Sequence, residues 1–248
     1  MTKEEFAALH TGSEPLVLFN IWDAGSARAV SDAGGRAIAT GSLSLAGAQG
    51  YDDGEQIPFE ALLEIVRRIA GTAPLPLSVD IETGYADEIE ALAANAAALR
   101  KAGAIGCNLE DQLIGSDALR DPYQQAARIA AVDAAGLFVN ARTDLFLAPL
   151  IAGESPNRAE LVVAAIERAV IYRDAGAGCL FVPGLSDPAL IAELCEAVSM
   201  PVNVMRLPGM LSNAELGRLG VARISHGPGP WREAMAQVGE AARAALAG

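Results

Sequence analysis

Two apolar runs of the chain each end in acidic residues. The first ends in Asp80 and Glu82, and the second ends in Glu110 and Asp111. Because alternate residues of a strand point to the same face, Asp80 and Glu82 share one side of their strand. Carboxylates at the end of a buried run are costly without a compensating cation, and Mg²⁺ or Mn²⁺ is the simplest one for oxygen ligands. The sequence therefore predicts a metal site at Asp80, Glu82 and Glu110. The alternative is a structural network of these acids with Arg142 and backbone amides.

Arg142 ends a third run, within the segment Val-Asn-Ala-Arg-Thr-Asp. The planar guanidinium fork binds carboxylates bidentately. We therefore predict that Arg142 binds the carboxylate of a small substrate. An ion pair with Asp144 or Glu110 is the alternative, and the two roles are compatible.

Small residues dominate the segment Thr40–Gly54. Small side chains let backbone N–H groups point at a ligand oxygen, which predicts an oxyanion-type nest. A flexible surface loop is the alternative interpretation of this segment.

Eight strands are expected to position these groups. They are Leu16–Trp22, Ala37–Ser42, Leu75–Glu82, Ile105–Gln112, Leu137–Asp144, Cys179–Gly184, Pro201–Met205 and Ala222–His226. Helical stretches between them include Phe59–Ala70, Ile89–Ala102, Asn157–Ala175, Pro188–Val198 and Asn213–Leu219. Alternation of this kind predicts parallel strands, and eight units in 248 residues favour one α/β domain, a closed (β/α)8 TIM barrel over 1–248.

The polar clusters fall at the C-terminal ends of the predicted strands, the rim on which barrels build their sites. His226 ends the last strand and is either a general acid or a structural histidine, whereas His10 is expected at the surface. A final helix, Pro230–Ala247, is expected to close the barrel or to pack on another subunit.

Composition excludes several classes of function. The net charge of −13 disfavours nucleic acid and anionic membrane as partners, because both need a basic face. The three cysteines have neither metal nor redox spacing and are expected to be buried thiols. No run is long enough to span a bilayer and no hydrophobic signal core begins the chain, so the cytoplasm is the expected compartment. The sequence shows no dinucleotide, Walker or serine-hydrolase motif.

Three motifs, in this order, carry a resemblance to a known family. They are Asp-Ile-Glu-Thr-Gly-Tyr at 80–85, Asn-Leu-Glu-Asp at 108–111 and Asn-Ala-Arg-Thr-Asp at 140–144. With them the chain resembles the isocitrate lyase/phosphoenolpyruvate mutase superfamily over nearly its whole length. The resemblance implies a TIM barrel whose eighth helix is exchanged between subunits of a dimer or of a dimer of dimers (a homotetramer). It also implies Mg²⁺-dependent making or breaking of a C–C or P–C bond beside the carboxylate of an α-keto or α-hydroxy acid.

The resemblance further implies roles for single residues. Asp80 is the expected direct metal ligand, and Asp53, Glu82 and Glu110 are expected to hold metal-bound waters. On the substrate side, it implies carboxylate binding by Arg142, N–H donors at Ser42 and Leu43, and a contact from Asn203.

Two departures from the family pattern concern proton transfer. Lyase members carry a catalytic cysteine, and mutase-like members a lysine, in the loop after the Glu-Asp motif. Here residues 112–123 contain no Cys, Lys or His and look short, and Gly184 stands where lyases have a glutamate. Cleavage of isocitrate or methylisocitrate by the usual acid is therefore not expected. Arg120, Ser116, Tyr85 or a metal-bound water must move the proton instead.

The sequence thus predicts a Mg²⁺-dependent lyase or hydrolase of a small α-keto or α-hydroxy (di)carboxylate or phosphonate, acting through an enolate. Its candidate catalytic residues are Arg142, Asp53 and Tyr85. Two alternatives stay open at this point. One is a non-catalytic metal and carboxylate binder, and the other is a metal-dependent pyruvate aldolase on a similar barrel.

Overall fold

A parallel sheet closes on itself in the computed structural model, which describes residues 1–12, 14–116 and 118–247. Its strands are β1 (Leu16–Leu18), β2 (Asn20–Ile21), β3 (Ile38–Thr40), β4 (Leu77–Asp80), β5 (Gly106–Glu110), β6 (Phe138–Arg142), β7 (Cys179–Val182), β8 (Val202–Met205) and β9 (Val221–Ser225). β1 pairs with β9 and β2 pairs with β3, so the two ends of the sheet are consecutive pieces of chain. The TIM-barrel prediction is confirmed.

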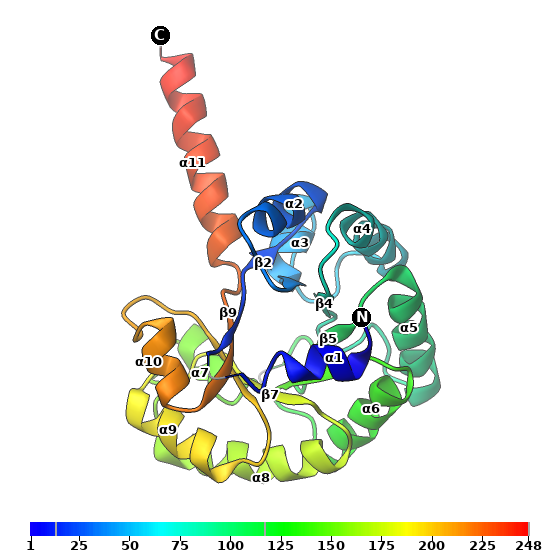
Figure 1. Cartoon of the computed structure of the whole chain (residues 1–248), viewed down its shortest axis with the longest axis vertical. Coiled ribbons are helices and arrows are strands. Elements are labelled where there is room, and N and C mark those ends of the chain that lie inside the picture. Colours follow the sequence, from blue (N-terminus) through cyan, green and yellow to red (C-terminus); the bar gives the residue numbers. More distant parts are fainter. Residues whose placement is uncertain (13, 117, 248) are drawn as a thin grey trace.

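Helices surround the sheet (Figure 1). They are α1 (Lys3–Ala8), α2 (Ala24–Asp32), α3 (Ser42–Ala48), α4 (Phe59–Thr72), α5 (Ile89–Ala102), α6 (Pro122–Ala134), α7 (Leu147–Ile151), α8 (Ala159–Asp174), α9 (Pro188–Ala197), α10 (Asn213–Arg218) and α11 (Gly229–Leu246). The main core lies between the sheet and these helices; α4, for example, buries Leu62, Leu63, Val66 and Ile69 on one face.

Each predicted strand lies where the sequence places one, but the first is broken in two at Phe19. The segment Thr40–Gly54 is the clearest difference from expectation. Instead of forming a loop, it begins the helix α3 directly after Gly41, which is the extended residue before the first helical turn. The small residues that suggested a loop also suit a helix, since Ala and Leu have high helix propensity.

One end of the barrel is plugged by α1. Phe6 is fully buried there with Leu16, Phe138 and other apolar residues of the barrel interior. His10 was expected at the surface and that prediction is wrong. Its ring stacks on Phe138 with centroids 4.6 Å apart, and burial lowers its pKa to about 4. A six-residue helix that folds back across the barrel leaves no periodic pattern from which its burial can be read.

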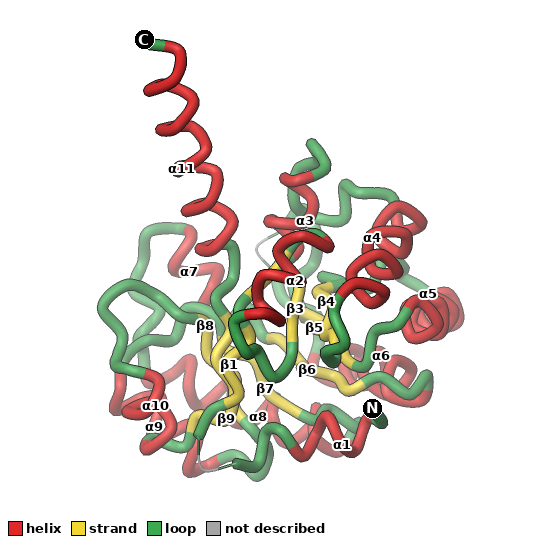
Figure 2. The backbone as a smooth tube through the Cα atoms, turned by 45° about the horizontal axis from the view of Figure 1, so that its top comes forward, coloured by secondary structure: helices red, strands yellow, loops and turns green. Residues whose placement is uncertain are grey.

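The last helix, α11, runs away from the barrel instead of lying on it (Figure 2). Within the part of the chain that the structure describes, Pro230 is the buried residue of this helix. No helix of that part combines the length and the hydropathy that crossing a membrane needs.

Candidate active site at the C-terminal rim

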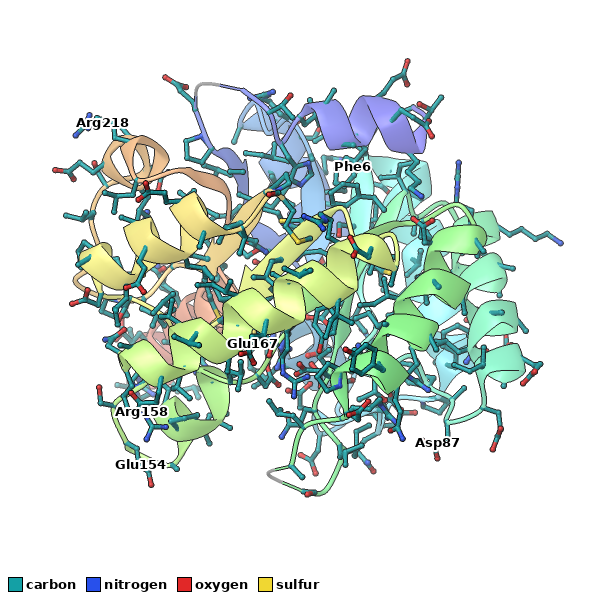
Figure 3. All side chains as sticks on the ribbon, turned by 90° about the horizontal axis from the view of Figure 1, so that it is seen from below. Phe6, Asp87, Glu154, Arg158, Glu167 and Arg218 are labelled. Atoms are coloured by element: carbon teal, nitrogen blue, oxygen red, sulfur yellow. The ribbon has the colours of Figure 1, made fainter. Side chains whose placement is uncertain are left out.

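The polar side chains singled out above gather at the barrel end opposite α1. Figure 3 shows Phe6 of α1 at one end and Asp87, in the loop after β4, at the other. Because all strands are parallel, their C-terminal ends meet at this rim. The register of the sheet pairs Asp80 with Asn108, Asn108 with Asn140, and Glu110 with Arg142.

Asp80 is the last residue of β4 and is 9% exposed. Its Oδ1 accepts a hydrogen bond from the backbone N–H of Glu82 at 3.2 Å, and its Oδ2 accepts one from Asn108 Nδ2, also at 3.2 Å. Burial raises the pKa of Asp80, although Arg142 opposes that shift. The structure therefore holds this carboxylate in a place where its charge needs a cation.

Glu82 is bound by a turn that the sequence did not single out. Both oxygens of its carboxylate accept from the backbone N–H of Glu55 at 2.9 Å. In return, Glu55 Oε1 accepts from Thr83 N at 3.0 Å, Thr83 Oγ1 at 2.7 Å and Tyr85 N at 2.9 Å. Glu55, Glu82 and Tyr85 all have positive φ, so this exchange of hydrogen bonds holds both turns in a conformation that such residues rarely adopt.

Glu55 is therefore a site residue that the sequence analysis missed. The only local signal was a glycine turn, Asp53-Gly54-Glu55, and nothing in one sequence pairs that turn with the loop after β4. Asp53 itself is exposed, yet it lies near enough to raise the pKa of Glu82. After burial, this repulsion is the largest cause that brings the pKa of Glu82 to about 8.

Arg142 makes both of the ion pairs weighed as alternatives. Its Nη1 lies 2.7 Å from Glu110 Oε2, and its Nε and Nη2 bind the two oxygens of Asp144 at 2.6 and 2.8 Å. Burial by itself lowers the pKa of Arg142, but Asp144 and Glu110 raise it well above its usual value, so the guanidinium stays charged. Three of its five N–H groups make these contacts, which leaves one on each Nη for a ligand.

Two further candidates lie near the same rim. Asn203 is on β8, and α3 begins just after β3. Asn203 is buried, and its Nδ2 donates to Ser225 Oγ at 3.0 Å. Ser42 and Leu43 are the first two residues of α3, and a helix does not use its first N–H groups in its own hydrogen bonds. Tyr85 is half-buried and packs against Phe59 with ring centroids 5.2 Å apart, and after burial the charge of Glu82 is the largest cause that raises its pKa.

The donor set fits magnesium better than a metal that needs a closed protein cage. No three His, Cys, Asp or Glu side chains among the described residues converge tightly enough to enclose an ion. Mg²⁺ typically keeps several waters and takes one or two carboxylates directly. Asp80, Glu82 and Glu110 are buried carboxyl groups with raised pKa values, and Arg142 opposes that rise at Asp80 and Glu110. A divalent cation would favour the ionised form of all three.

The structure shows the surroundings of both departures from the family pattern. After β5, an antiparallel bridge pairs Gln112 with Leu119. Arg120 is anchored beside it, since its N–H donates to the backbone oxygen of Asp111 at 2.7 Å. Gly184 has φ +104°, and a Cβ there would lie 2.6 Å from the backbone oxygen of Phe146. A glutamate cannot occupy position 184 unless that segment moves.

The raised pKa values give a prediction for pH. A carboxyl group whose pKa is raised by folding stabilises the protein below its unfolded value and loses that contribution as pH rises. For Glu82 the window runs from about 4.5 to about 8. We expect the melting temperature of metal-free protein to fall across this window. Saturating Mg²⁺ should reduce the fall, because binding requires the ionised form.

Thermal melts from pH 5 to pH 9, with and without Mg²⁺, measure this effect. Below about pH 8, Mg²⁺ affinity should rise by up to about tenfold per pH unit if one proton is released on binding. A Mg²⁺-induced shift of equal size at every pH would contradict the assignment of Glu82 to the metal site.

A known protein family matches nearly the whole chain. The family model described as phosphoenolpyruvate phosphomutase matches residues 6–246. The chain belongs to this family. The resemblance of its motifs to the isocitrate lyase/phosphoenolpyruvate mutase superfamily is thereby confirmed.

Relatives within the family differ in how much is known of them. The uncharacterized protein Rv1998c of Mycobacterium tuberculosis is 39% identical over 243 residues, which are 96% of this chain and 88% of that protein. The 2-methylisocitrate lyase of Escherichia coli is 30% identical over 199 residues, which are 79% of this chain and 67% of the enzyme. A 2-methylisocitrate lyase is thus among the relatives of this family member.

Solved structures agree with the barrel described above. A crystal structure of a Burkholderia cenocepacia J2315 protein is 46% identical, has a TM-score of 0.92, and covers 98% of this chain and 99% of its own. A phosphonopyruvate hydrolase in complex with oxalate and Mg²⁺ has a TM-score of 0.83 at 22% identity, with 97% of this chain and 85% of that chain covered. At that identity the second likeness shows the shared fold alone.

Proposed function

We propose that this protein is a Mg²⁺-dependent lyase or hydrolase that cleaves a C–C or P–C bond of a small α-keto or α-hydroxy (di)carboxylate or phosphonate. The observation that carries the proposal is the cluster of buried acids at the rim. Asp80 and Glu110 lie near Arg142, which still has two N–H groups to offer, and Glu82 is buried close to Asp80. Such a site suits a divalent cation together with a doubly oxygenated anion.

Each residue has a defined task in this proposal. Asp80 binds the metal directly, and Asp53, Glu82 and Glu110 hold its waters. The free N–H groups of Arg142 bind the substrate carboxylate. When bound, Mg²⁺ supplies a Lewis acid for the negative charge that develops on the keto oxygen.

The remaining tasks concern the developing enolate. The N–H groups of Ser42 and Leu43 donate to the enolate and carboxylate oxygens, and Asn203, held by Ser225, contacts the far side of the substrate. Stabilising charge that appears only in the transition state is usually the largest contribution to such a rate. Tyr85 is the protein group we propose for delivering a proton to the carbanion carbon. Burial raises the pKa of its hydroxyl group above the usual value, which keeps the hydroxyl protonated at neutral pH.

The residue types of the segment after β5 favour one kind of substrate within this class. A retro-aldol cleavage needs a base that removes a hydroxyl proton, whereas a β-keto acid loses CO₂ with no prior proton removal. The described part of the loop offers no cysteine, lysine or histidine for the first reaction. We therefore propose a β-keto acid of the oxaloacetate type as the first substrate to test.

A non-catalytic metal and carboxylate binder is the second candidate function, because the same loop lacks the usual proton donor. A pyruvate aldolase is a third. Three measurements test these candidates. Oxalate, an enolate mimic, should raise the melting temperature only with Mg²⁺ present in both of the first two cases. Turnover of oxaloacetate, phosphonopyruvate, 2-methylisocitrate and dimethylmalate then distinguishes enzyme from binder, and pyruvate exchange of its methyl protons identifies an aldolase. No effect of oxalate would reject the first two candidates together.

We also propose that α11 packs on a second copy of the chain. An apolar groove with a cavity volume of about 550 Å³ lies between β1 and α2, lined by Val17, Phe19, Ala29 and Val30 among others. On α11, Trp231, Met235 and Val238 recur at helical spacing, and Met235 and Val238 are 41% and 61% exposed. A helix from a partner would cover this groove, and the partner would cover α11, in a dimer or in a dimer of dimers.

Two substitutions test this assembly. The double variant Met235→Glu/Val238→Glu places charge on the apolar stripe, so we expect its mass by light scattering to fall towards the 25.6 kDa of one chain. The matched control Ala236→Glu/Gln237→Glu adds the same charge to the opposite face and should keep the wild-type mass. A wild-type protein that is already monomeric would contradict the proposal.

The expected compartment, the cytoplasm, stays a prediction.

A further inference from the structure

A buried arginine lies in the barrel interior below the acidic rim. Arg223 of β9 is 0% exposed, and its strand neighbour in the register is Asn203. Among the described residues, no carboxylate lies within ion-pair distance of it, and its Nε and Nη1 have no hydrogen-bond partner. Burial lowers its pKa to about 10, so it is still protonated at neutral pH. An unpaired buried cation is expensive, and the core packing of the barrel gives no reason for one.

The side-chain hydrogen bond that Arg223 makes among the described residues leads towards the proposed metal site. Its Nη2 donates to Asn108 Oδ1 at 3.4 Å, and Asn140 Nδ2 donates to the same oxygen at 2.7 Å. Asn108 Nδ2 in turn donates to Asp80 Oδ2 at 3.2 Å. The register explains the row, because Asp80, Asn108 and Asn140 are paired neighbours on β4, β5 and β6.

The chemistry of these groups fixes the direction of the row. A guanidinium has donors only, and the amide nitrogen of Asn140 is also a donor. The Asn108 atom that faces both of them must therefore be its oxygen, and its NH₂ group must face Asp80. With the opposite orientation, an amide oxygen would face a carboxylate and an NH₂ group would face two donors. Arg223 and Asn140 thus favour the same orientation of Asn108, and Arg223 is the partner that can only donate.

We propose that Arg223 is a positioning residue for the metal site, which acts through Asn108 to orient the Asp80 carboxylate and leave its outer lone pairs to the cation. This inference rests on the proposed function, because it takes Asp80 as the metal ligand. Partners that orient metal ligands in this way typically change metal affinity by 10- to 100-fold when they are removed. Arg223 matters because a guanidinium cannot accept a hydrogen bond, whereas the Asn140 amide could turn and present its oxygen.

The experiment compares Mn²⁺ binding to metal-free protein, measured by electron paramagnetic resonance, across a set of buried variants. Arg223→Met should raise the Kd for Mn²⁺ by about 10- to 100-fold. Arg223→Lys should recover part of the loss, since an ammonium group also donates. Cys179→Ala is the matched control, because it thins the same barrel interior beside Arg223 while its own hydrogen bond goes to the backbone oxygen of Leu180 and not to the row, and it should bind Mn²⁺ as the wild type does.

Asn108→Leu keeps the proposal testable if Arg223→Met does not fold, because it breaks the same row at its centre. It should weaken Mn²⁺ binding at least as much, and adding Arg223→Met to it should cause no further loss. Wild-type affinity in Asn108→Leu, or additive losses in the double variant, would overturn the inference.

A metal-independent signal separates this inference from the proposed function. In metal-free protein, the side-chain NH₂ of Asn108 should be protected from solvent exchange and its NMR signals should shift in Arg223→Met but not in Cys179→Ala. If the wild type binds no Mn²⁺, the proposed function fails. The NMR comparison in metal-free protein still tests the Arg223–Asn108 contact in that case. Unchanged Asn108 signals in Arg223→Met would overturn the positioning role, whatever the metal does.

Discussion

Asp80→Ala should abolish the Mg²⁺-dependent rise in melting temperature that oxalate causes, and should lower turnover by about a thousandfold or more. The reason is that Asp80 is the one carboxylate proposed to touch the metal, whose charge stabilisation contributes several kcal/mol to such a transition state. Differential scanning fluorimetry with Mg²⁺ and oxalate measures the first effect, and steady-state kinetics on the best substrate of the screen measures the second.

The same variant should leave the metal-free protein close to wild-type stability. Asp80 is buried, and its raised pKa shows that its charge is unfavourable there. Losing that charge offsets the loss of its hydrogen bonds with Glu82 and Asn108. Asp174→Ala, at an exposed ion pair with Arg173, is the control and should change neither property. An Asp80→Ala protein that still responds to oxalate with Mg²⁺ would remove the basis of the proposed metal site.

Arg142→Met should destabilise the protein by about 3–5 kcal/mol, because it leaves Glu110 and Asp144 buried without their cation. For a chain of this size that corresponds to a fall in melting temperature of about 10 °C. Thermal or urea unfolding measures the change. Arg173→Met removes an ion pair with the exposed Asp174 and is the matched control, with an expected change within about 0.5 kcal/mol.

Arg142→Lys separates stability from substrate binding. Lysine keeps the charge and should restore most of the stability, but it has no planar fork for a carboxylate. We expect its KM for a carboxylate substrate to rise by about a hundredfold, which corresponds to two lost charge-assisted hydrogen bonds. A stable Arg142→Lys protein with wild-type KM would show that Arg142 serves only the ion pairs seen in the structure.

Local sequence signals were sufficient for the repeating units of the barrel. The helix Ile89–Ala102 begins and ends where its sequence predicts, because Gly103 in the left-handed conformation stops it. The motifs that end β4, β5 and β6 were likewise readable, since acids at the end of an apolar run are costly in any fold. Short elements were not readable. The helices α1 and α3 have six and seven residues, too few to show a period.

The sequence by itself therefore determined the barrel, its rim and the acids and arginine placed there. Only the tertiary structure decided which of these groups meet. It joined Glu55 to Glu82, drew Arg142 between Glu110 and Asp144, buried His10 under the barrel, and placed Arg223 behind Asn108. The physical reason is that hydrophobic periodicity and propensity act over a few neighbouring residues. Apart from the Arg142–Asp144 pair, these contacts span 27 to 128 positions and depend on how the sheet closes.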